Sequence, residues 1–335
     1  MENKIDIIAE IAQGYMGDTS LCKQFIEAAS SANATSVKFQ LVYADELATK
    51  DYKYYNLFKS LEINEKDWKS LVLFSKKKKI KLYFDIFGEK SLKLAEKLKV
   101  ETIKIHPTDL TNYFFLKKVS SSKIKNIILG LGGYKFENIF KAVNLFNQNK
   151  NIILMHGFQG YPTPENENHL NRIDFFKKKF KKSNIKFAFA DHSIPDSLDS
   201  NLASILAIGK GISCIEKHLT LSKILKMEDY ESAYNPDEFF SYVKIIKKAF
   251  ILLGINHVNK NNFKLSKKEK NYLKNISRSY VFKKNVKKNT KLNLEMFNLK
   301  RTSYKKAITA DYDIGKKILK KDKKIGQVLF LKEIS

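Results

Sequence analysis

Short apolar runs recur along the first two thirds of the chain, and most are separated by segments whose apolar residues follow helical spacing. The runs with strand character are Ile5–Ile11, Ser36–Val42, Ile80–Ile86, Thr102–Ile105, Asn126–Leu129, Asn151–Met155, Ile185–Ala190 and Ile212–Leu219. The segments with helical character are Leu21–Ala32, Trp68–Lys77, Ser91–Leu98, Phe136–Phe146, Ile173–Phe180, Ser200–Ile208 and Pro236–Leu253. This alternation predicts an α/β fold, a (β/α)8 TIM barrel, with a doubly wound open sheet as the alternative. No GxGxxG follows the first strand, which disfavours the open dinucleotide-binding sheet.

The pattern changes after Leu253, so we expect the barrel to occupy residues 1–255. Residues 256–276 are polar and rich in lysine, which predicts a linker. Residues 277–335 contain short β-like pieces between basic turns and predict a small β-rich domain. The β-like pieces are Ser279–Phe282, Met296–Leu299 and Gln327–Leu331. A domain of this size is near the lower limit for independent stability, so we expect it to lean on the barrel or on a neighbouring subunit.

The net charge of +27 raises the possibility of nucleic-acid binding, but the type of basic residue argues against specific binding. Of the 62 basic residues three are arginines, Arg172, Arg278 and Arg301, and the other 59 are lysines spread through the helical segments. Base reading and bidentate phosphate contacts favour arginine. We therefore interpret the surplus as solvated helix faces and expect no specific nucleic-acid partner.

Cysteine content and hydropathy point to the cytoplasm. Cys22 and Cys214 stand in apolar surroundings and form no CxxC pair, as in a reduced intracellular protein. The N-terminal residues lack the basic and apolar regions of a signal peptide, and no apolar run reaches about 18 residues. We therefore expect a cytoplasmic, globular protein with no membrane span.

Polar residues close most of the predicted strands, at the end of a TIM barrel where active sites lie. They are Glu10, Lys38, Gln40, Asp85, Lys104, His106, His156, Gln159, Tyr161, Asp191, His192, Glu216 and His218. Lys38 and Lys104 stand inside apolar strands, where a buried ammonium group needs an anionic partner or ligand. A salt bridge with Glu10 or Asp85 and a contact with an anionic substrate both remain open.

The eighth predicted strand carries a carboxylate and an imidazole on one face. Alternation places Cys214, Glu216 and His218 on that face, and Ile215 and Lys217 on the other. His192 and His218 close adjacent strands and could share one divalent metal ion that keeps coordination positions open for substrate. Each histidine could instead satisfy local hydrogen bonds, so the pattern alone leaves both readings open.

Several segments together resemble the sialic acid synthases in order and spacing. They are IIAEIAQGYMGD from Ile7, SVKFQ from Ser36, TIKIHPTDLTN from Thr102, LMHGFQGYPTP from Leu154, FADHS from Phe189, IEKHLT from Ile215 and NPDEF from Asn235. The C-terminal SRSYVFKKNVKKNTKL and NLKR resemble the antifreeze-like (SAF) domain of that family. The resemblance runs nearly end to end, and ADHS and EKHLT are its most specific elements.

The resemblance implies condensation of phosphoenolpyruvate with an open-chain N-acetylated amino sugar, which gives a nonulosonic (sialic-type) acid and phosphate. It implies a divalent metal ion, manganese with magnesium or cobalt as other options, on His192 and His218. Glu10, Glu216 and Asp229 match carboxylates around metal and sugar, with Glu10 a candidate for water or proton handling. The residues that match substrate-binding positions are Lys38, Gln40, Asp85, Lys104, Asp109, Gln159, Tyr161 and Arg301. Arg301 matches an arginine that reaches the partner's sugar site, which implies a domain-swapped homodimer.

The departures from the family pattern cluster on the phosphoenolpyruvate side. Asp85 replaces the threonine of a usual Thr-Pro-Phe, and Pro107 and Ala190 each replace a serine. Gly130, Leu131, Gly132 and Gly133 replace a Ser-Thr-Gly-Met turn, whose backbone N–H groups could still bind an anion. Two alternatives therefore stay open: a metal-dependent barrel enzyme with a changed carbon donor or a lyase-type reaction, and a non-catalytic anion-binding descendant.

Overall fold

The computed structural model describes residues 4–195, 198–254, 261 and 263–335. The chain divides into two compact units, Met1–Asn256 and His257–Ser335. The predicted barrel end at residue 255 lies outside the described residues.

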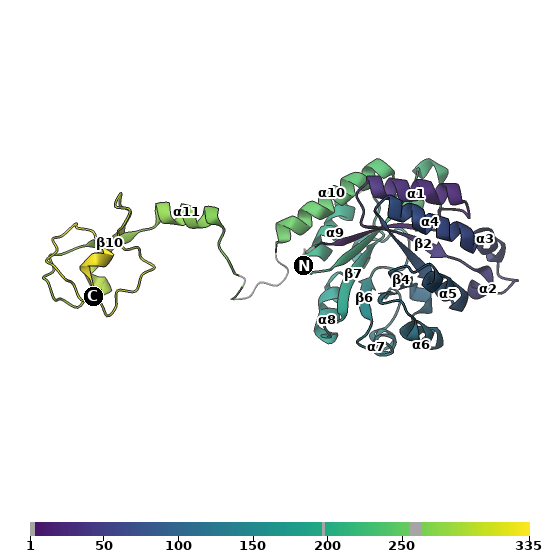
Figure 1. Ribbon diagram of the computed structural model, residues 1–335, viewed down its shortest axis with the longest axis horizontal. Coiled ribbons are helices and arrows are strands. Elements are labelled where there is room, and N and C mark those ends of the chain that lie inside the picture. Colours follow the sequence, from purple (N-terminus) through teal and green to yellow (C-terminus); the bar gives the residue numbers. More distant parts are fainter. Residues whose placement is uncertain (1–3, 196–197, 255–260, 262) are drawn as a thin grey trace. The chain divides into compact units, whose positions relative to one another are not determined.

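The first unit is a closed barrel of eight parallel strands (Figure 1). Its strands are β1 (Asp6–Ala12), β2 (Ser36–Leu41), β3 (Lys81–Ile86), β4 (Thr102–Ile105), β5 (Asn126–Gly130), β6 (Asn151–His156), β7 (Ile185–Asp191) and β8 (Cys214–Leu219). Each strand pairs with the next in sequence, and β1 pairs with β8 to close the barrel. A two-residue strand, β9 (Ala233–Tyr234), adds to β8. The predicted (β/α)8 barrel is confirmed, and each predicted strand lies within two residues of an observed one.

Helices follow the strands and cover the outside of the barrel (Figure 1). They are α1 (Thr19–Ser31), α2 (Ala44–Leu47), α3 (Tyr55–Ser60), α4 (Glu65–Lys77), α5 (Glu89–Lys97), α6 (Tyr113–Ser121), α7 (Phe136–Asn144), α8 (Asn171–Lys179), α9 (Leu198–Gly209) and α10 (Pro236–Leu253). The sequence pattern did not predict α2, α3 and α6. The first two are four and six residues long, too short to show a period.

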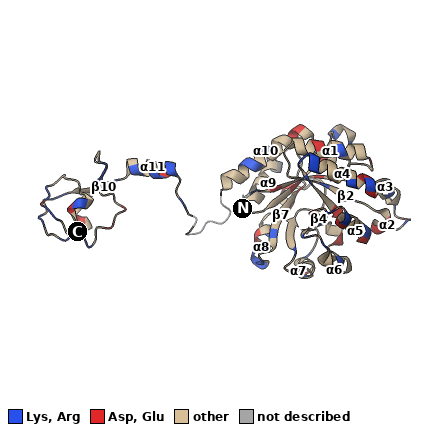
Figure 2. Ribbon diagram, viewed as in Figure 1, with Lys and Arg blue, Asp and Glu red and all other residues tan. Residues whose placement is uncertain are grey.

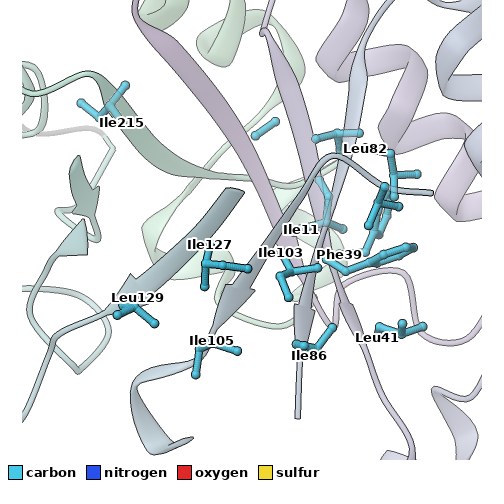
Figure 3. Packing of buried hydrophobic residues seen from close by; sticks show 14 of the residues in the cluster. Ile11, Phe39, Leu41, Leu82, Ile86, Ile103, Ile105, Ile127, Leu129 and Ile215 are labelled. Carbon is cyan, nitrogen blue, oxygen red and sulfur yellow. The ribbon is translucent and has the colours of Figure 1, made fainter. Parts of the chain in front are cut away.

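Side chains on the barrel strands alternate between two faces, as a period of two requires. The outward face packs against the helices and forms the main core (Figure 3). It includes Ile11, Phe39, Leu41, Leu82, Ile86, Ile103, Ile105, Ile127, Leu129 and Ile215. The residues between them, Lys38, Asp85 and Lys104, are therefore directed to the inside of the barrel, where all three are buried.

The inside of the barrel has an apolar layer followed by a charged layer. The apolar layer contains Ile8, Tyr83 and Cys214, together with residues of β5, β6 and β7. Two residues further along the same strands come Glu10, Asp85 and Glu216, all nearly inaccessible to solvent. The charged residues thus lie nearer the carboxyl ends of the strands, where a TIM barrel carries its site.

The second unit has a small core around an antiparallel pair, β10 (Ser279–Phe282) and β11 (Phe297–Lys300). The β-like piece predicted at Gln327–Leu331 is not a strand but forms isolated antiparallel bridges, such as Val281 to Val328. Helix α11 (Lys267–Ile276) lies in the segment predicted as a linker. Its capping box explains the start: Glu269 N–H donates to Ser266 Oγ, and Ser266 N–H to the Glu269 carboxylate.

The distribution of charge agrees with the prediction that basic residues lie on helices, and it extends to the second unit. Lys and Arg occur on helices around the barrel and in the second unit (Figure 2). Among the described residues, no helix is both long and apolar enough to cross a membrane.

Candidate active site

A polar cavity opens at the carboxyl ends of the barrel strands. Its lining residues are Glu10, Ala12, Gln40, Asp85, Lys104, His106, Pro107, Gly130, Leu131, Gly132, Met155, Gly157, Gln159, Tyr161, Ala190, His192, Glu216, His218 and Asp229. Every strand of the barrel, or the loop directly after it, contributes to this lining. The cavity therefore occupies the position at which TIM barrels bind and convert substrates.

Most residues predicted from the sequence meet in this cavity. Those that line it are Glu10, Gln40, Asp85, Lys104, Gln159, Tyr161, His192, Glu216, His218 and Asp229. Three predicted substrate ligands are not among the lining residues. Lys38 lies beneath the cavity floor and is fully buried, and Asp109 accepts a hydrogen bond from Asn112 Nδ2 at 3.1 Å. Arg301 belongs to the second unit and donates from Nε to the Ile276 carbonyl at 3.2 Å.

Lys38 is the centre of a buried ion cluster. Its ammonium group contacts Glu10, lies 2.5 Å from Asp85 Oδ2 and 3.5 Å from Glu216 Oε2. Burial acts against the charge, but Asp85, Glu10 and Glu216 hold the pKa of Lys38 well above its ordinary value. The structure thus agrees with the interpretation of Lys38 as a salt-bridge residue. It pairs with both predicted partners, Glu10 and Asp85, and also with Glu216.

Lys104 extends the cluster to the cavity surface. Its Nζ lies 2.6 Å from Glu216 Oε1. Burial opposes ionisation of Glu216, yet Lys104 and Lys38 lower the pKa of this carboxyl to about 2. For Glu10 the balance is reversed: burial outweighs Lys38 and raises its pKa. Glu216 is therefore ionised, whereas Glu10 holds a proton more tightly than usual. Two carboxyl groups with opposite pKa shifts can take different roles, one as a fixed charge and one in proton transfer.

A β-bulge sets the position of Glu10. The register between β1 and β2 shifts between Glu10 and Ala12, and Ala12 adopts a left-handed backbone with φ 51°. Ala12 N–H then donates to Glu10 Oε1 at 2.6 Å. A non-glycine residue in this conformation costs on the order of 1 kcal/mol. Bulges of this kind are common beside active sites, where they re-aim a side chain.

His192 and His218 face one another across the cavity, with ring centroids 5.4 Å apart. Burial lowers the pKa of His192 to about 4 and that of His218 well below its ordinary value, so both imidazoles are neutral near pH 7. His192 Nδ1 lies 2.8 Å from the Phe158 carbonyl and must donate to it, which leaves Nε2 with a free lone pair. The ring of Tyr161 lies 4.5 Å from His192 and 5.4 Å from His218.

Two neutral imidazoles with one fixed tautomer suit a divalent metal ion. His218 Nδ1 also lies 3.8 Å from Asp229 Oδ2. Within the described part of the chain, no group of three or more His, Cys, Asp or Glu side chains is arranged to hold a metal ion. The two imidazoles therefore supply fewer side-chain ligands than the three usual in catalytic metal sites, so an ion held here would need water or substrate as its other ligands.

The turn after β5 lines the cavity and contains a backbone N–H without a protein acceptor among the described residues. Leu131 N–H donates a hydrogen bond to the Met155 carbonyl at 3.0 Å. Gly132 N–H has no hydrogen-bond acceptor among the described residues. Side chains would not fit here: a Cβ on Gly130 would lie 2.7 Å from Pro107, and one on Gly132 would lie 2.8 Å from the Gly157 carbonyl. The glycines thus let this turn pack closely against the loops that follow β4 and β6.

Sequence reasoning left several lining residues without a role. His106, Pro107, Met155 and Gly157 line the cavity but were not assigned to the site. His106 directly follows β4, and its position at a strand end was the signal for it. Gly157 packs against Ala190, because a Cβ on it would lie 3.0 Å from the Ala190 Cβ. Small residues that make room for a ligand carry no polar signal in the sequence.

We expect the metal-free protein to lose stability as pH falls from 6.5 to 4. Burial lowers the pKa of His156, at the end of β6, to about 4, and the pKa returns to about 6.5 on unfolding. The unfolded state therefore binds more protons in this window, so stability is full above pH 6.5 and declines below it. This histidine should contribute about 2 kcal/mol of the loss between pH 7 and pH 5.

Urea unfolding of the wild type and of His156→Gln at both pH values measures this contribution. Glutamine can keep the hydrogen bond to the Asn168 carbonyl, which His156 Nε2 makes at 2.8 Å. The variant should show the shallower pH dependence. Identical pH dependence in the two proteins would show that His156 is not held neutral by burial.

The first unit is a closed parallel barrel, and carboxylate, lysine and histidine side chains gather at the carboxyl ends of its strands. These features define a (β/α)8 barrel with an enzyme-like site. The NeuB family model matches residues 25–258. An N,N'-diacetyllegionaminic acid synthase of Campylobacter jejuni is 30% identical over 300 residues, which cover 84% of this chain and 86% of that protein. The chain therefore belongs to the NeuB family of sialic acid synthases and their relatives.

Other similar proteins agree with this assignment. An uncharacterized protein of Methanocaldococcus jannaschii is 31% identical over 298 residues, covering 88% of this chain and 84% of its own. The crystal structure of N-acetylneuraminic acid (sialic acid) synthetase from Leptospira borgpetersenii, in complex with citrate, has a TM-score of 0.72 and 27% identity. The match covers 81% of this chain and 90% of that one.

Proposed function

We propose that this chain is a nonulosonic acid synthase that condenses phosphoenolpyruvate with an open-chain N-acetylated amino sugar and releases phosphate. The observation that supports it most is the meeting of the predicted residues in one cavity, although they come from all parts of the barrel. The membership in the NeuB family supports the same reaction class. Location in the cytoplasm remains part of the proposal.

The third carbon of phosphoenolpyruvate forms a bond with the aldehyde carbon of the sugar, and the aldehyde oxygen takes up a proton. Water adds to the second carbon of phosphoenolpyruvate and gives up its protons as the bond from this carbon to the phosphate oxygen breaks. The products are a nine-carbon 2-keto-3-deoxy acid and inorganic phosphate.

His192 and His218 would hold a divalent metal ion, manganese in our proposal, with magnesium or cobalt as other options. Such an ion supplies Lewis-acid polarisation of the aldehyde. Tyr161, whose ring contacts both imidazoles, and Gln159 would bound the same part of the cavity. Asp229 carries a pKa raised to about 7 by burial and by Glu228 and Glu231, so it can exchange a proton near neutral pH.

Lys104 and the Gly132 N–H would bind the anionic end of phosphoenolpyruvate, and Gln40 would contact it from β2. Asp85 does not exclude this donor, because its Oδ2 is paired with Lys38 rather than directed alone at the ligand. Lys38 then acts through its neighbours: it holds Glu10, Asp85 and Glu216 in place and offsets their charge. Glu10, with its raised pKa, is the group we assign to proton handling at the water or the aldehyde oxygen.

A changed carbon donor is the second candidate. Asp85 lines the cavity, and its Oδ1 is buried with no hydrogen-bond partner among the described residues, so this oxygen could accept a hydrogen bond from a ligand. A phosphate oxygen cannot supply one unless it is protonated, whereas a hydroxyl or amide can. The unpaired Asp85 oxygen therefore favours a carbon donor that carries an N–H or O–H group at that end of the cavity.

Arg301 is the residue of the second unit that we assign to substrate binding. Its guanidinium is exposed, so it is accessible to an anionic or hydroxylated sugar. We propose that it serves the sugar site of a partner subunit in a domain-swapped homodimer, with the unit acting as an antifreeze-like domain. Asp109, whose pKa is raised mainly by burial, is the remaining substrate-binding candidate.

Phosphate release from phosphoenolpyruvate, measured with manganese and a panel of N-acetylated amino sugars, tests the proposal. We expect release to depend on both the sugar and the metal. Glu10→Gln keeps the size of the side chain and the acceptor for Ala12 N–H, and should lower kcat by about 10²–10⁴ with little change in KM for phosphoenolpyruvate. An unchanged kcat in this variant would contradict the role of Glu10, and release without sugar would contradict the condensation.

A further inference from the structure

A buried ion pair stands directly behind the two cavity histidines. Lys217 Nζ lies 3.2 Å from Asp191 Oδ1, and both side chains are 0% exposed. Asp191 and Lys217 are direct neighbours in the pairing of β7 with β8. Each precedes one of the histidines in sequence. Because successive side chains point to opposite faces, the ion pair lies outside the barrel wall where the imidazoles lie inside.

The pair brackets His192 from both sides. Lys217 Nζ also donates to the Ser193 carbonyl at 2.7 Å, and Ser193 N–H donates to Asp191 Oδ1 at 2.9 Å. The residues before and after His192 are therefore tied to the residue before His218. Motion of one histidine backbone relative to the other would break these buried bonds, which is costly in an apolar environment.

Two hydroxyls extend the cluster into the helices. Ser204 Oγ of α9 donates to Asp191 Oδ2 at 2.5 Å and lies 2.9 Å from the hydroxyl of Tyr242 on α10. Ser204 is fully buried and Tyr242 is 1% exposed. Lys217 Nζ further lies 5.4 Å from the ring centroid of Tyr234 on β9. The ends of β7 and β8 are thus fixed to three outer elements.

We propose that the Asp191–Lys217 pair is a positioning device that sets the distance and orientation of His192 and His218 for a shared divalent metal ion. The proposal rests on the metal site of the proposed function. Stability alone is a weak reason for the pair, because well-packed apolar residues are often as stabilising as a buried ion pair. Partners that orient metal-binding histidines typically contribute 10–100-fold to metal affinity.

The test compares manganese affinity, measured by calorimetry, in the wild type, Lys217→Met/Asp191→Asn and Tyr242→Phe. The double variant removes both charges together, so no buried charge is left unpaired. Tyr242→Phe removes one hydroxyl from the far end of the cluster and preserves packing, so it keeps the test open if the double variant does not fold. Lys150→Met is the matched control, since Lys150 is buried in the same unit and its Nζ bonds the Ser122 carbonyl, the Ser122 hydroxyl and the Ile124 carbonyl rather than residues next to the histidines.

We expect manganese affinity to fall 10–100-fold in the double variant and severalfold in Tyr242→Phe, with no change in Lys150→Met. The absorption spectrum of the cobalt-substituted double variant should also shift, because the ligand geometry changes. Wild-type affinity and an unchanged cobalt spectrum in both cluster variants would overturn the positioning role while leaving the metal site intact. Failure of the wild type to bind either metal would overturn the metal site itself, and the positioning role with it.

Discussion

Replacing both His192 and His218 with alanine should reduce product formation at least 10³-fold. The two rings face each other 5.4 Å apart, and burial keeps both neutral, the form in which an imidazole binds a metal ion. If the ion contributes more than about 4 kcal/mol to transition-state stabilisation, its loss corresponds to at least this factor in rate. The measurement is phosphate release at saturating manganese.

His156→Gln is the matched control for this loss, because His156 is also buried and neutral but is not a lining residue of the cavity. It should retain activity near pH 7. Single alanine variants should each weaken manganese binding, so added metal should restore part of their activity. Full activity of the double variant in the presence of a chelator would show that the reaction does not use these histidines as metal ligands.

Lys38→Met should destabilise the barrel by at least 3–5 kcal/mol, the range found when one partner of a buried pair is removed. The ammonium group is the shared partner of Glu10, Asp85 and Glu216, and its loss leaves three acidic groups together in the barrel interior. Urea unfolding monitored by circular dichroism measures the loss. A variant that does not fold at all would agree with the upper end of this expectation.

The double variant Lys38→Met/Asp85→Asn tests whether Lys38 serves as the counter-ion of Asp85 or as a ligand of the substrate. Removing one of the three acidic groups should recover part of the stability, with a coupling energy on the order of 2 kcal/mol between the two positions. Additive effects would show that Asp85 and Lys38 do not depend on one another. A Lys38→Met protein as stable as the wild type would favour the alternative in which Lys38 binds substrate.

The sequence was sufficient for the barrel because its signals are local and repeated. Most strands combine an apolar outward face with a polar residue near the carboxyl end, and the alternation with a period of two follows from the extended backbone itself. The same alternation predicted that Glu216 and His218 share one face of β8 and that Lys217 lies on the other. Glu216 and His218 do line the cavity together, and Lys217 is not among its lining residues. Helix α6 (Tyr113–Ser121) was missed although α5, α7 and α8, which were predicted, have the same length of nine residues.

The arrangement of charges could not be predicted in the same way. Lys38 was expected to meet Glu10 or Asp85, but three partners for one ammonium group require the closure of β1, β2, β3 and β8 in space. The pairing of Lys217 with Asp191 joins residues on different strands, and no spacing within either strand indicates it. Asp109 was assigned by position in a motif, and its bond to Asn112 depends on the turn that follows β4.

Calorimetric titration of phosphoenolpyruvate into manganese-loaded protein tests the central claim most directly, since it requires no knowledge of the sugar. The His192→Ala/His218→Ala protein and manganese without protein serve as controls. We predict metal-dependent binding in the micromolar range that is lost in the double variant. Absence of binding to a folded wild type that holds manganese would contradict phosphoenolpyruvate as the donor and favour a molecule that donates a hydrogen bond to Asp85.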